Sequence, residues 1–346
     1  MVRWLKISKT LGIKIRFKHN YRQLTVIVQQ NKLKIIIMKN QTSKVNPIRK
    51  YYKQNASRFV LIFAVLLFTC SVVQAQTEWP QMVYSKDGTP ISYKVYGNGE
   101  PTLVFIHGWS CDSRYWQNQI SAFSKNNKIV LVDLAGHGHS GMNRKKYTME
   151  AFGEDVKAVV ENMGCQNCIL IGHSMGGEVI AEAALLMPER VIGLIGVDTY
   201  HDVAYALSQE EFDMMLEPIK EDFQAGTQQF VQSMLLPDTD AQLNEWIKAD
   251  MSAAPPAAAL CAMEELMALS ISGEAAQIYD EIRIPIVAVN TDMWPVNIEE
   301  NRKHMHTFEL IVINKADHFL MMSSPAEFNK ALKQAINNIV EKEGSK

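Results

Sequence analysis

A serine flanked by glycines is the pattern in this chain that points most directly to chemistry. The stretch Gly172-His173-Ser174-Met175-Gly176-Gly177 follows the apolar run 168–171. Glycines two positions before and two positions after a serine permit a sharp turn from a strand into a helix, which holds the serine oxygen at the edge of a sheet. We therefore predict that Ser174 is a nucleophile; an ordinary glycine-rich turn is the alternative.

A serine nucleophile needs a general base, and the base is in turn oriented by a carboxylate. In the strand–turn–helix arrangement these residues follow in the order serine, acid, histidine. His318 comes just after the last predicted strand, where a loop can carry it to Ser174, and we predict that it is the base. Three other histidines lie beyond the serine in less suitable positions: His201, His304 and His306.

Two aspartates compete for the role of the acid, because each follows a predicted strand. Asp292 comes after the strand 287–290, and Asp198 comes after the strand 191–197. We predict that Asp292 orients the histidine and keep Asp198 as the alternative. Capping of a helix or loop is the non-catalytic interpretation of either residue.

Backbone amides are also needed to stabilise the oxyanion that forms during acyl transfer. The stretch His107-Gly108-Trp109 ends the first predicted parallel strand, and Met175 directly follows the nucleophile. We expect the N–H groups of Trp109 and Met175 to form this oxyanion hole. The side chains of Trp109 and His201 are candidates for substrate contact, with simple packing as the alternative for the tryptophan.

Alternating strand and helix patterns must position these residues. A predicted hairpin over 82–96 precedes short, continuously apolar strands, which are typical of a parallel sheet covered on both faces. The predicted strands are 102–106, 128–133, 168–172, 191–197, 285–290 and 309–313, and the accompanying helices are 114–123, 149–163, 176–187 and 325–340. The fold class is therefore α/β, with a doubly wound, mostly parallel sheet.

Residues 200–275 interrupt this alternation with four helical stretches, broken at Pro218, Pro237 and Pro255-Pro256. Methionine and aromatic residues recur there, which indicates a helical subdomain with its own small core. Such a subdomain can also cover the carboxyl edge of the sheet as a cap, where α/β sheets bind ligands. The expected organisation is a leader over 1–75, a core over 76–199, the cap over 200–275 and the rest of the core over 276–346.

These motifs together resemble the α/β-hydrolase superfamily, in its serine-nucleophile branch with a helical cap. The resemblance spans roughly residues 82–340 and includes the stretch 133–140, where it implies structural roles for Asp133 and Ser140. It implies an esterase- or lipase-like enzyme. Epoxide hydrolases and dehalogenases are disfavoured, because Ser174 stands where they have an aspartate. Asp317 stands where the family commonly has a glycine.

The N-terminal segment has the pattern of an export signal. Fifteen of the 35 basic residues and none of the 37 acidic residues lie within 1–58, and the uncharged apolar run 59–73 follows. This pattern predicts a secretory signal peptide that is cleaved after Ala75. A retained transmembrane anchor is the alternative, although the run is shorter than the roughly 18–20 residues that a bilayer requires. Residues 1–37 are expected to be an unstructured extension or to precede a translation start at Met38.

The chain beyond the leader carries 20 basic and 37 acidic residues, which disfavours nucleic acids and anionic membranes as partners. We expect a secreted or periplasmic protein without stable membrane insertion. No cofactor and no metal are expected, because the sequence has no P-loop, no dinucleotide fingerprint and no metal-ligand cluster. Cys165 and Cys168 have a spacing compatible with a disulfide, and two free thiols are the alternative.

The expected function is that of an exported serine hydrolase, which cleaves an ester or related acyl bond through an acyl-enzyme. The substrate is expected to be small to medium in size and partly apolar. A carbon–carbon bond hydrolase, an aminopeptidase and an acyltransferase are the alternatives on the same fold. A non-catalytic ligand-binding protein is the alternative from another class, and the set of Ser174, Asp292 and His318 argues against it.

Overall fold

The structure is a computed structural model that describes residues 3–6, 14–20, 23–27, 34–38 and 80–343, and the chain divides into the units Met1–Thr77 and Glu78–Lys346. The first unit contains a four-stranded antiparallel sheet, in the order β1 (Arg3–Lys6), β2 (Lys14–Asn20), β3 (Gln23–Ile27) and β4 (Lys34–Met38). These strands differ from the unstructured extension expected over 1–37, and β-branched residues such as those of β4 favour them. The predicted export signal over 59–75 lies outside the described residues.

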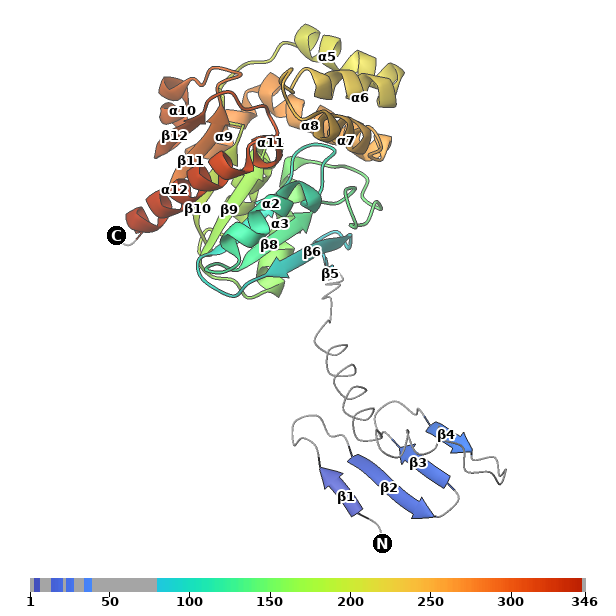
Figure 1. Cartoon of the computed structure of the whole chain (residues 1–346). Coiled ribbons are helices and arrows are strands. Elements are labelled where there is room, and N and C mark those ends of the chain that lie inside the picture. The colour runs from blue at the N-terminus through green and yellow to red at the C-terminus, as the bar shows by residue number, and fades with distance from the viewer. Residues whose placement is uncertain (1–2, 7–13, 21–22, 28–33, 39–79, 344–346) are drawn as a thin grey trace. The chain divides into compact units, whose positions relative to one another are not determined.

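The second unit is built around an eight-stranded sheet in the order β12-β11-β10-β9-β7-β8-β6-β5 (Figure 1). Its strands are β5 (Gln81–Tyr84), β6 (Pro90–Tyr96), β7 (Thr102–Ile106), β8 (Ile129–Asp133), β9 (Cys168–His173), β10 (Val191–Val197), β11 (Ile286–Thr291) and β12 (Phe308–Ile313). β6 pairs antiparallel with β5 and with β8, whereas all the pairs from β8 through β12 are parallel. The predicted α/β fold class, with a mostly parallel sheet, is confirmed.

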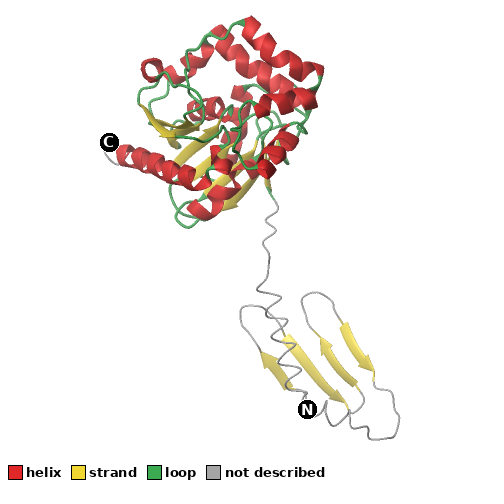
Figure 2. Ribbon diagram, turned by 45° about the horizontal axis from the view of Figure 1, so that its top comes forward, coloured by secondary structure: helices red, strands yellow, loops and turns green. Residues whose placement is uncertain are grey.

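Helices cover both faces of this sheet, as Figure 2 shows. α3 (Met149–Asn162) and α4 (Gly176–Leu186) pack together on one face, and α2 (Gln117–Phe123) and α12 (Pro325–Glu343) pack together on the other. The central strands β7, β8, β9 and β11 are buried at every residue. Their continuous apolar sequence is therefore explained by helices on both sides.

The cap lies between β10 and β11 in the sequence. It contains α5 (Gln209–Glu221), α6 (Phe223–Gln232), α7 (Ala241–Met251) and α8 (Pro256–Ser272), and α9 (Glu274–Asp280) follows. Ser208, Asp222 and Asp240 cap the first three of these helices by accepting backbone N–H groups of the first turn. The break expected at Pro218 is absent, because α5 continues through this residue. Figure 1 shows α5 to α8 over one end of the sheet.

No helix in the described part of the chain is long and apolar enough to cross a membrane by itself. α7 and α8 meet the requirements of length and composition only as a pair, and they are bent by 93° at the break between them.

Candidate active site

Ser174 lies at the sharp turn between β9 and α4. Its φ is 51°, which is in the left-handed region that side chains rarely adopt. The turn can be tight because the residues two positions before and after the serine, Gly172 and Gly176, lack side chains. A Cβ at Gly172 would lie 2.1 Å from the carbonyl oxygen of Gly176, and a Cβ at Gly176 would lie 2.8 Å from that of Ile106. Ser174 is partly exposed at the edge of the sheet, which suits the nucleophile role predicted for it.

His318 and Asp198 are hydrogen-bonded at the same edge of the sheet. Nδ1 of His318 lies 2.6 Å from Oδ2 of Asp198, and both side chains are buried. Oδ1 of Asp198 accepts the backbone N–H and the hydroxyl of Thr291, at 2.9 and 3.1 Å. Burial alone would raise the pKa of Asp198, but the nearby imidazole of His201 and the hydrogen bond from His318 hold that pKa well below its ordinary value. The ionised carboxylate can therefore orient an imidazole that is protonated on Nδ1.

Asp292 makes no hydrogen bond or ion pair with His318 in the described structure, where Asp198 is the partner of the imidazole, so the prediction that Asp292 orients the histidine is wrong. Asp292 is exposed, and its Oδ1 accepts the backbone N–H of Lys315 at 2.8 Å. The alternative, Asp198, follows β10, which is the neighbour of β9, the strand that leads to Ser174, whereas Asp292 follows β11, one strand further away. The aspartate that follows the strand next to β9 is the one that reaches the histidine.

No hydrogen bond joins the hydroxyl of Ser174 to His318 among the described residues. Catalytic hydrogen bonds are often long in the absence of substrate and shorten in the complex. Nδ1 of the imidazole is hydrogen-bonded to Asp198, so Nε2 is the nitrogen available to a serine hydroxyl.

The loop after β7 lies against the turn at Ser174. A Cβ at Gly108 would lie 2.8 Å from Nδ1 of His173 and 3.3 Å from Cβ of Ser174, so this close approach depends on glycine. No hydrogen bond from the backbone N–H of Trp109 or of Met175 is found within the described residues. Two amides without an acceptor, one next to Ser174 in the sequence and one on the adjoining loop, suit the expected oxyanion hole.

His107 and His173 are buried behind the site and act as structural hydrogen-bonding groups. Nδ1 of His107 donates to the carbonyl of Gly108 at 2.8 Å, and Nε2 accepts the N–H of Leu134 at 3.0 Å. Nε2 of His173 donates to the carbonyl of His318 at 2.9 Å. Burial lowers the pKa of His107, and it lowers that of His173 to about 3, so both imidazoles are neutral.

His201 lies beside Asp198, with Nε2 3.8 Å from Oδ1 of the carboxylate. Its ring packs edge-on against Trp294, with centroids 5.7 Å apart, and Trp294 packs edge-on against His318 at 5.6 Å. Sequence reasoning missed Trp294, although an aromatic residue two positions after Asp292 is a signal that could have found it. Contact between His201 and a substrate stays a prediction.

The two remaining late histidines lie elsewhere. His304 ends α10 (Ile298–His304), and its Nδ1 lies 3.0 Å from Oδ1 of Asp280. His306 is exposed. Neither residue contacts Ser174 or His318 in the described structure.

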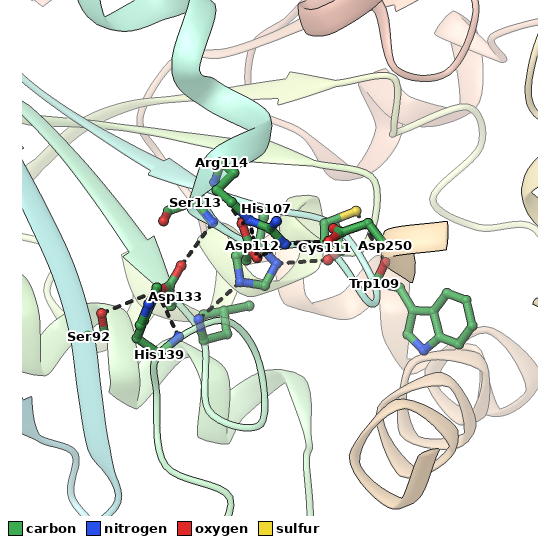
Figure 3. Close-up of polar contacts among 12 residues, drawn as sticks. Ser92, His107, Trp109, Cys111, Asp112, Ser113, Arg114, Asp133, His139 and Asp250 are labelled. Carbon is green, nitrogen blue, oxygen red and sulfur yellow. Dashed lines mark hydrogen bonds and ion pairs between the residues drawn. The ribbon is translucent and has the colours of Figure 1, made fainter. Parts of the chain in front are cut away.

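Asp133 holds together the loops that follow β7 and β8, as Figure 3 shows. Its carboxylate accepts the backbone N–H groups of Ser113 and His139, at 2.9 and 3.1 Å, and the hydroxyl of Ser92 at 3.2 Å. Its carbonyl oxygen accepts the hydroxyl of Ser140 at 2.6 Å. These contacts agree with the structural roles that the resemblance implies for Asp133 and Ser140.

The side chain of Trp109 packs into the cap. Its indole N–H donates to the carbonyl of Ala259 in α8 at 2.7 Å. The ring packs edge-on against Phe223 and Phe230 of α6, with centroid distances of 6.4 and 5.8 Å. The residue is only 4% exposed, so packing is the role that this structure assigns to the side chain, and contact with a substrate stays a prediction.

Cys165 and Cys168 are free and buried thiols in this structure. A hydrogen bond between them lowers the pKa of Cys165 and raises that of Cys168. Within the described residues, no group of three or more histidine, cysteine, aspartate or glutamate side chains could hold a metal ion.

Comparison with known proteins agrees with this fold. A family model described as alpha/beta hydrolase fold matches residues 101–325. A bifunctional esterase/perhydrolase of Acinetobacter calcoaceticus is 39% identical over 101 residues, which cover 29% of this chain and 37% of that protein. A pimeloyl-[acyl-carrier protein] methyl ester esterase of Yersinia enterocolitica is 31% identical over 144 residues, covering 40% of this chain and 54% of that protein. The chain therefore spans between about a third and just over half of the length of these relatives.

A solved structure with a similar fold is that of a bromoperoxidase from Bacillus anthracis. It matches with a TM-score of 0.66 at 20% identity, over 75% of this chain and 100% of that one. At this level of identity, the likeness concerns the fold.

Proposed function

Because the chain belongs to the α/β-hydrolase fold family, we propose that it is a serine esterase in which Ser174, His318 and Asp198 are the catalytic residues. The 2.6 Å hydrogen bond between Asp198 and His318, at the edge of the sheet where Ser174 lies, is the observation that carries this proposal. The relatives that are named as esterases support an ester substrate.

In the first half of the reaction, Oγ of Ser174 attacks the carbonyl carbon of the ester while Nε2 of His318 accepts its proton. Asp198 stabilises the imidazolium that forms. The N–H groups of Trp109 and Met175 donate to the developing oxyanion, and each such donor contributes on the order of 3 kcal/mol to the stability of the transition state.

The tetrahedral intermediate collapses when His318 gives its proton to the leaving alkoxide, and the acyl group remains on Ser174. A water molecule then attacks the acyl carbon while His318 accepts one of its protons. The carboxylic acid leaves, and the histidine returns the proton to the serine. Each proton taken up is released again, so the enzyme is regenerated.

A small to medium, partly apolar substrate is part of the proposal. Two aromatic side chains of the cap, those of Phe223 and Phe230, pack against Trp109. They support an apolar acyl or alcohol group in the substrate. Export is a further part of the proposal. Mass spectrometry of the purified protein tests it, with a mature N-terminus at Gln76 as the expected result and an uncleaved leader as the contrary one.

A fluorophosphonate probe tests the nucleophile directly. We expect it to label the wild-type protein at Ser174 and to leave Ser174→Ala unlabelled, and an unlabelled but folded wild type would overturn the proposal. p-Nitrophenyl esters of graded chain length, beside amide and lactone substrates, then define the reaction. Turnover of amides without esters would instead favour an aminopeptidase, and neither labelling nor turnover would favour a binding protein.

A further inference from the structure

The linker between α6 and α7, residues 233–240, contacts the loop that carries His318. The carbonyl oxygen of Met234 accepts the backbone N–H of His318 at 3.1 Å. The hydroxyl of Thr239 donates to Oδ2 of Asp317 at 2.6 Å, across 78 residues of sequence. One short segment of the cap therefore holds two consecutive residues of the loop that supplies the base.

Asp317 is a buried carboxylate, 1% exposed, which needs hydrogen-bond donors on both oxygens. Oδ1 accepts the N–H of Phe319, in the same loop, at 2.9 Å. It also accepts the hydroxyl of Ser323, in the following helix α11 (Leu320–Ser323), at 2.8 Å. In the described part of the chain, Asp317 has no ion pair, and Thr239 is the donor to Oδ2. Removing a donor to a buried charged group is costly, so the cap hydroxyl matters for the position of this loop.

A local turn explains only half of this arrangement. Aspartates commonly accept the N–H group two residues ahead, which accounts for the bond between Oδ1 and Phe319. The bond from Thr239 to Oδ2 has no such local origin, because it comes from the cap. The imidazole of His318 is fixed separately by Asp198, so the contacts with the cap restrain the backbone that carries the ring.

We propose that Thr239 is a positioning residue for His318: by holding Asp317, it fixes the base loop so that the docked cap places Nε2 of the histidine for proton transfer from Ser174. This inference rests on the proposed function and deepens it. When the cap moves away, the loop loses the acceptor for the His318 N–H and the donor to Asp317 together. A displacement of a catalytic group by about 1 Å can cost roughly a hundredfold in rate.

Thr239→Val removes the hydroxyl and keeps the shape of the side chain. We expect kcat for a p-nitrophenyl ester to fall about tenfold to a hundredfold while KM changes less than about twofold, because the substrate's own contacts remain. Thr239→Ser restores the hydroxyl and should recover kcat to within about threefold of wild type. Thr227→Val is the matched control, because the hydroxyl of this buried threonine in α6 has no hydrogen-bond partner in the described part of the chain.

Hydrogen exchange of the intact protein gives a readout that does not need turnover. Peptides that cover residues 317–323 should exchange faster in Thr239→Val than in the wild type, Thr239→Ser or Thr227→Val. A thermal unfolding curve checks that each variant is folded.

Three results would overturn the proposal: wild-type kcat in Thr239→Val, a Thr239→Ser variant as slow as Thr239→Val, or unchanged exchange over 317–323. If the wild type neither reacts with a fluorophosphonate nor cleaves esters, the proposed function fails. The exchange experiment then decides separately whether the cap holds the base loop.

Discussion

Asp198 and His318 are separated by 120 residues in the sequence and joined by a 2.6 Å hydrogen bond in the structure. The same carboxylate accepts two hydrogen bonds from Thr291, at 2.9 and 3.1 Å, so its position is fixed independently of the histidine. A carboxylate held in this way selects the imidazole tautomer with a proton on Nδ1 and leaves Nε2 able to accept a proton.

Asp198→Asn should therefore lower kcat by about 10³–10⁴-fold, because an asparagine does not stabilise the imidazolium and favours the wrong tautomer. Asp292→Asn is the matched control. Asp292 is exposed and accepts the N–H of Lys315, so we expect kcat to change by less than about threefold. Steady-state kinetics with a p-nitrophenyl ester measure both variants, and the reverse order of effects would contradict the assignment of the acid.

The sequence could not decide between these two aspartates, because both follow a buried strand of the same sheet. The choice depends on the order of the strands in space and on the path of each loop. Asp198 has a φ of 45° at the end of β10, next to β9, whereas the carboxylate of Asp292 accepts the backbone N–H of Lys315. Neither property has a signature in the residues around the aspartates.

The sheet and the turn at Ser174 were predictable for a physical reason. The continuous apolar runs 102–106 and 191–197 coincide with β7 and β10, because strands buried on both faces need apolar residues at every position. The break expected at Pro218 did not follow, since α5 buries Leu216 and Ile219 on either side of this proline. Tertiary packing outweighed the local preference there.

His201→Gln tests whether this histidine acts through the acid or on the substrate. Nε2 of His201 lies 3.8 Å from Oδ1 of Asp198, and a partly exposed pair of this kind contributes roughly 0.2–1 kcal/mol. We expect kcat to fall by up to about fivefold with KM nearly unchanged. His304→Gln, whose partner is Asp280, should leave both constants at wild-type values. A rise in KM alone for His201→Gln would instead support contact with the substrate.

Gly172→Ala should distort the turn at Ser174. Its Cβ would lie 2.1 Å from the carbonyl oxygen of Gly176, so the backbone must shift, at a cost of about 1–3 kcal/mol or more. Gly273→Ala is the control, because this glycine has a φ of 76° and open space around it. The alanine should lower the free energy of unfolding only by the roughly 1–2 kcal/mol that the left-handed conformation costs a residue with a side chain. Urea unfolding and kcat distinguish the two: only Gly172→Ala should displace Ser174 and abolish most of the activity.

Glu178 should make the stability of the protein depend on pH. It lies in the first turn of α4 and lines a hollow of about 530 Å³, and burial raises the pKa of its carboxyl from 4.5 to about 7. A group whose pKa is raised on folding contributes stability that is fully present below its unfolded pKa and is lost as the pH rises through its folded pKa. The contribution of protonated Glu178 should therefore be lost between about pH 4.5 and 7.

Glu178→Gln removes this dependence. Urea unfolding measures the free energy of unfolding of both proteins. The value for the variant minus the value for the wild type should increase as the pH rises from about 5 to 8. Glu210→Gln, at an exposed position of α5, serves as the control. Its free energy of unfolding should differ from that of the wild type by the same amount at every pH in this range. A constant difference for Glu178→Gln as well would contradict the prediction.

The cap of this chain is not an interchangeable module. The carbonyl of Ala259 accepts the indole N–H of Trp109, and Asp250 pairs with Arg114, so the insertion is bonded to two residues that follow β7. Replacing the whole cap would leave the buried indole N–H of Trp109 without its acceptor, at a cost of about 1–3 kcal/mol. Arg114 would lose Asp250 and keep its other partner, Asp112. Changes in substrate preference are therefore more accessible through single substitutions within the cap than through its exchange, and residues on the two sides of these bonds should vary together among related chains.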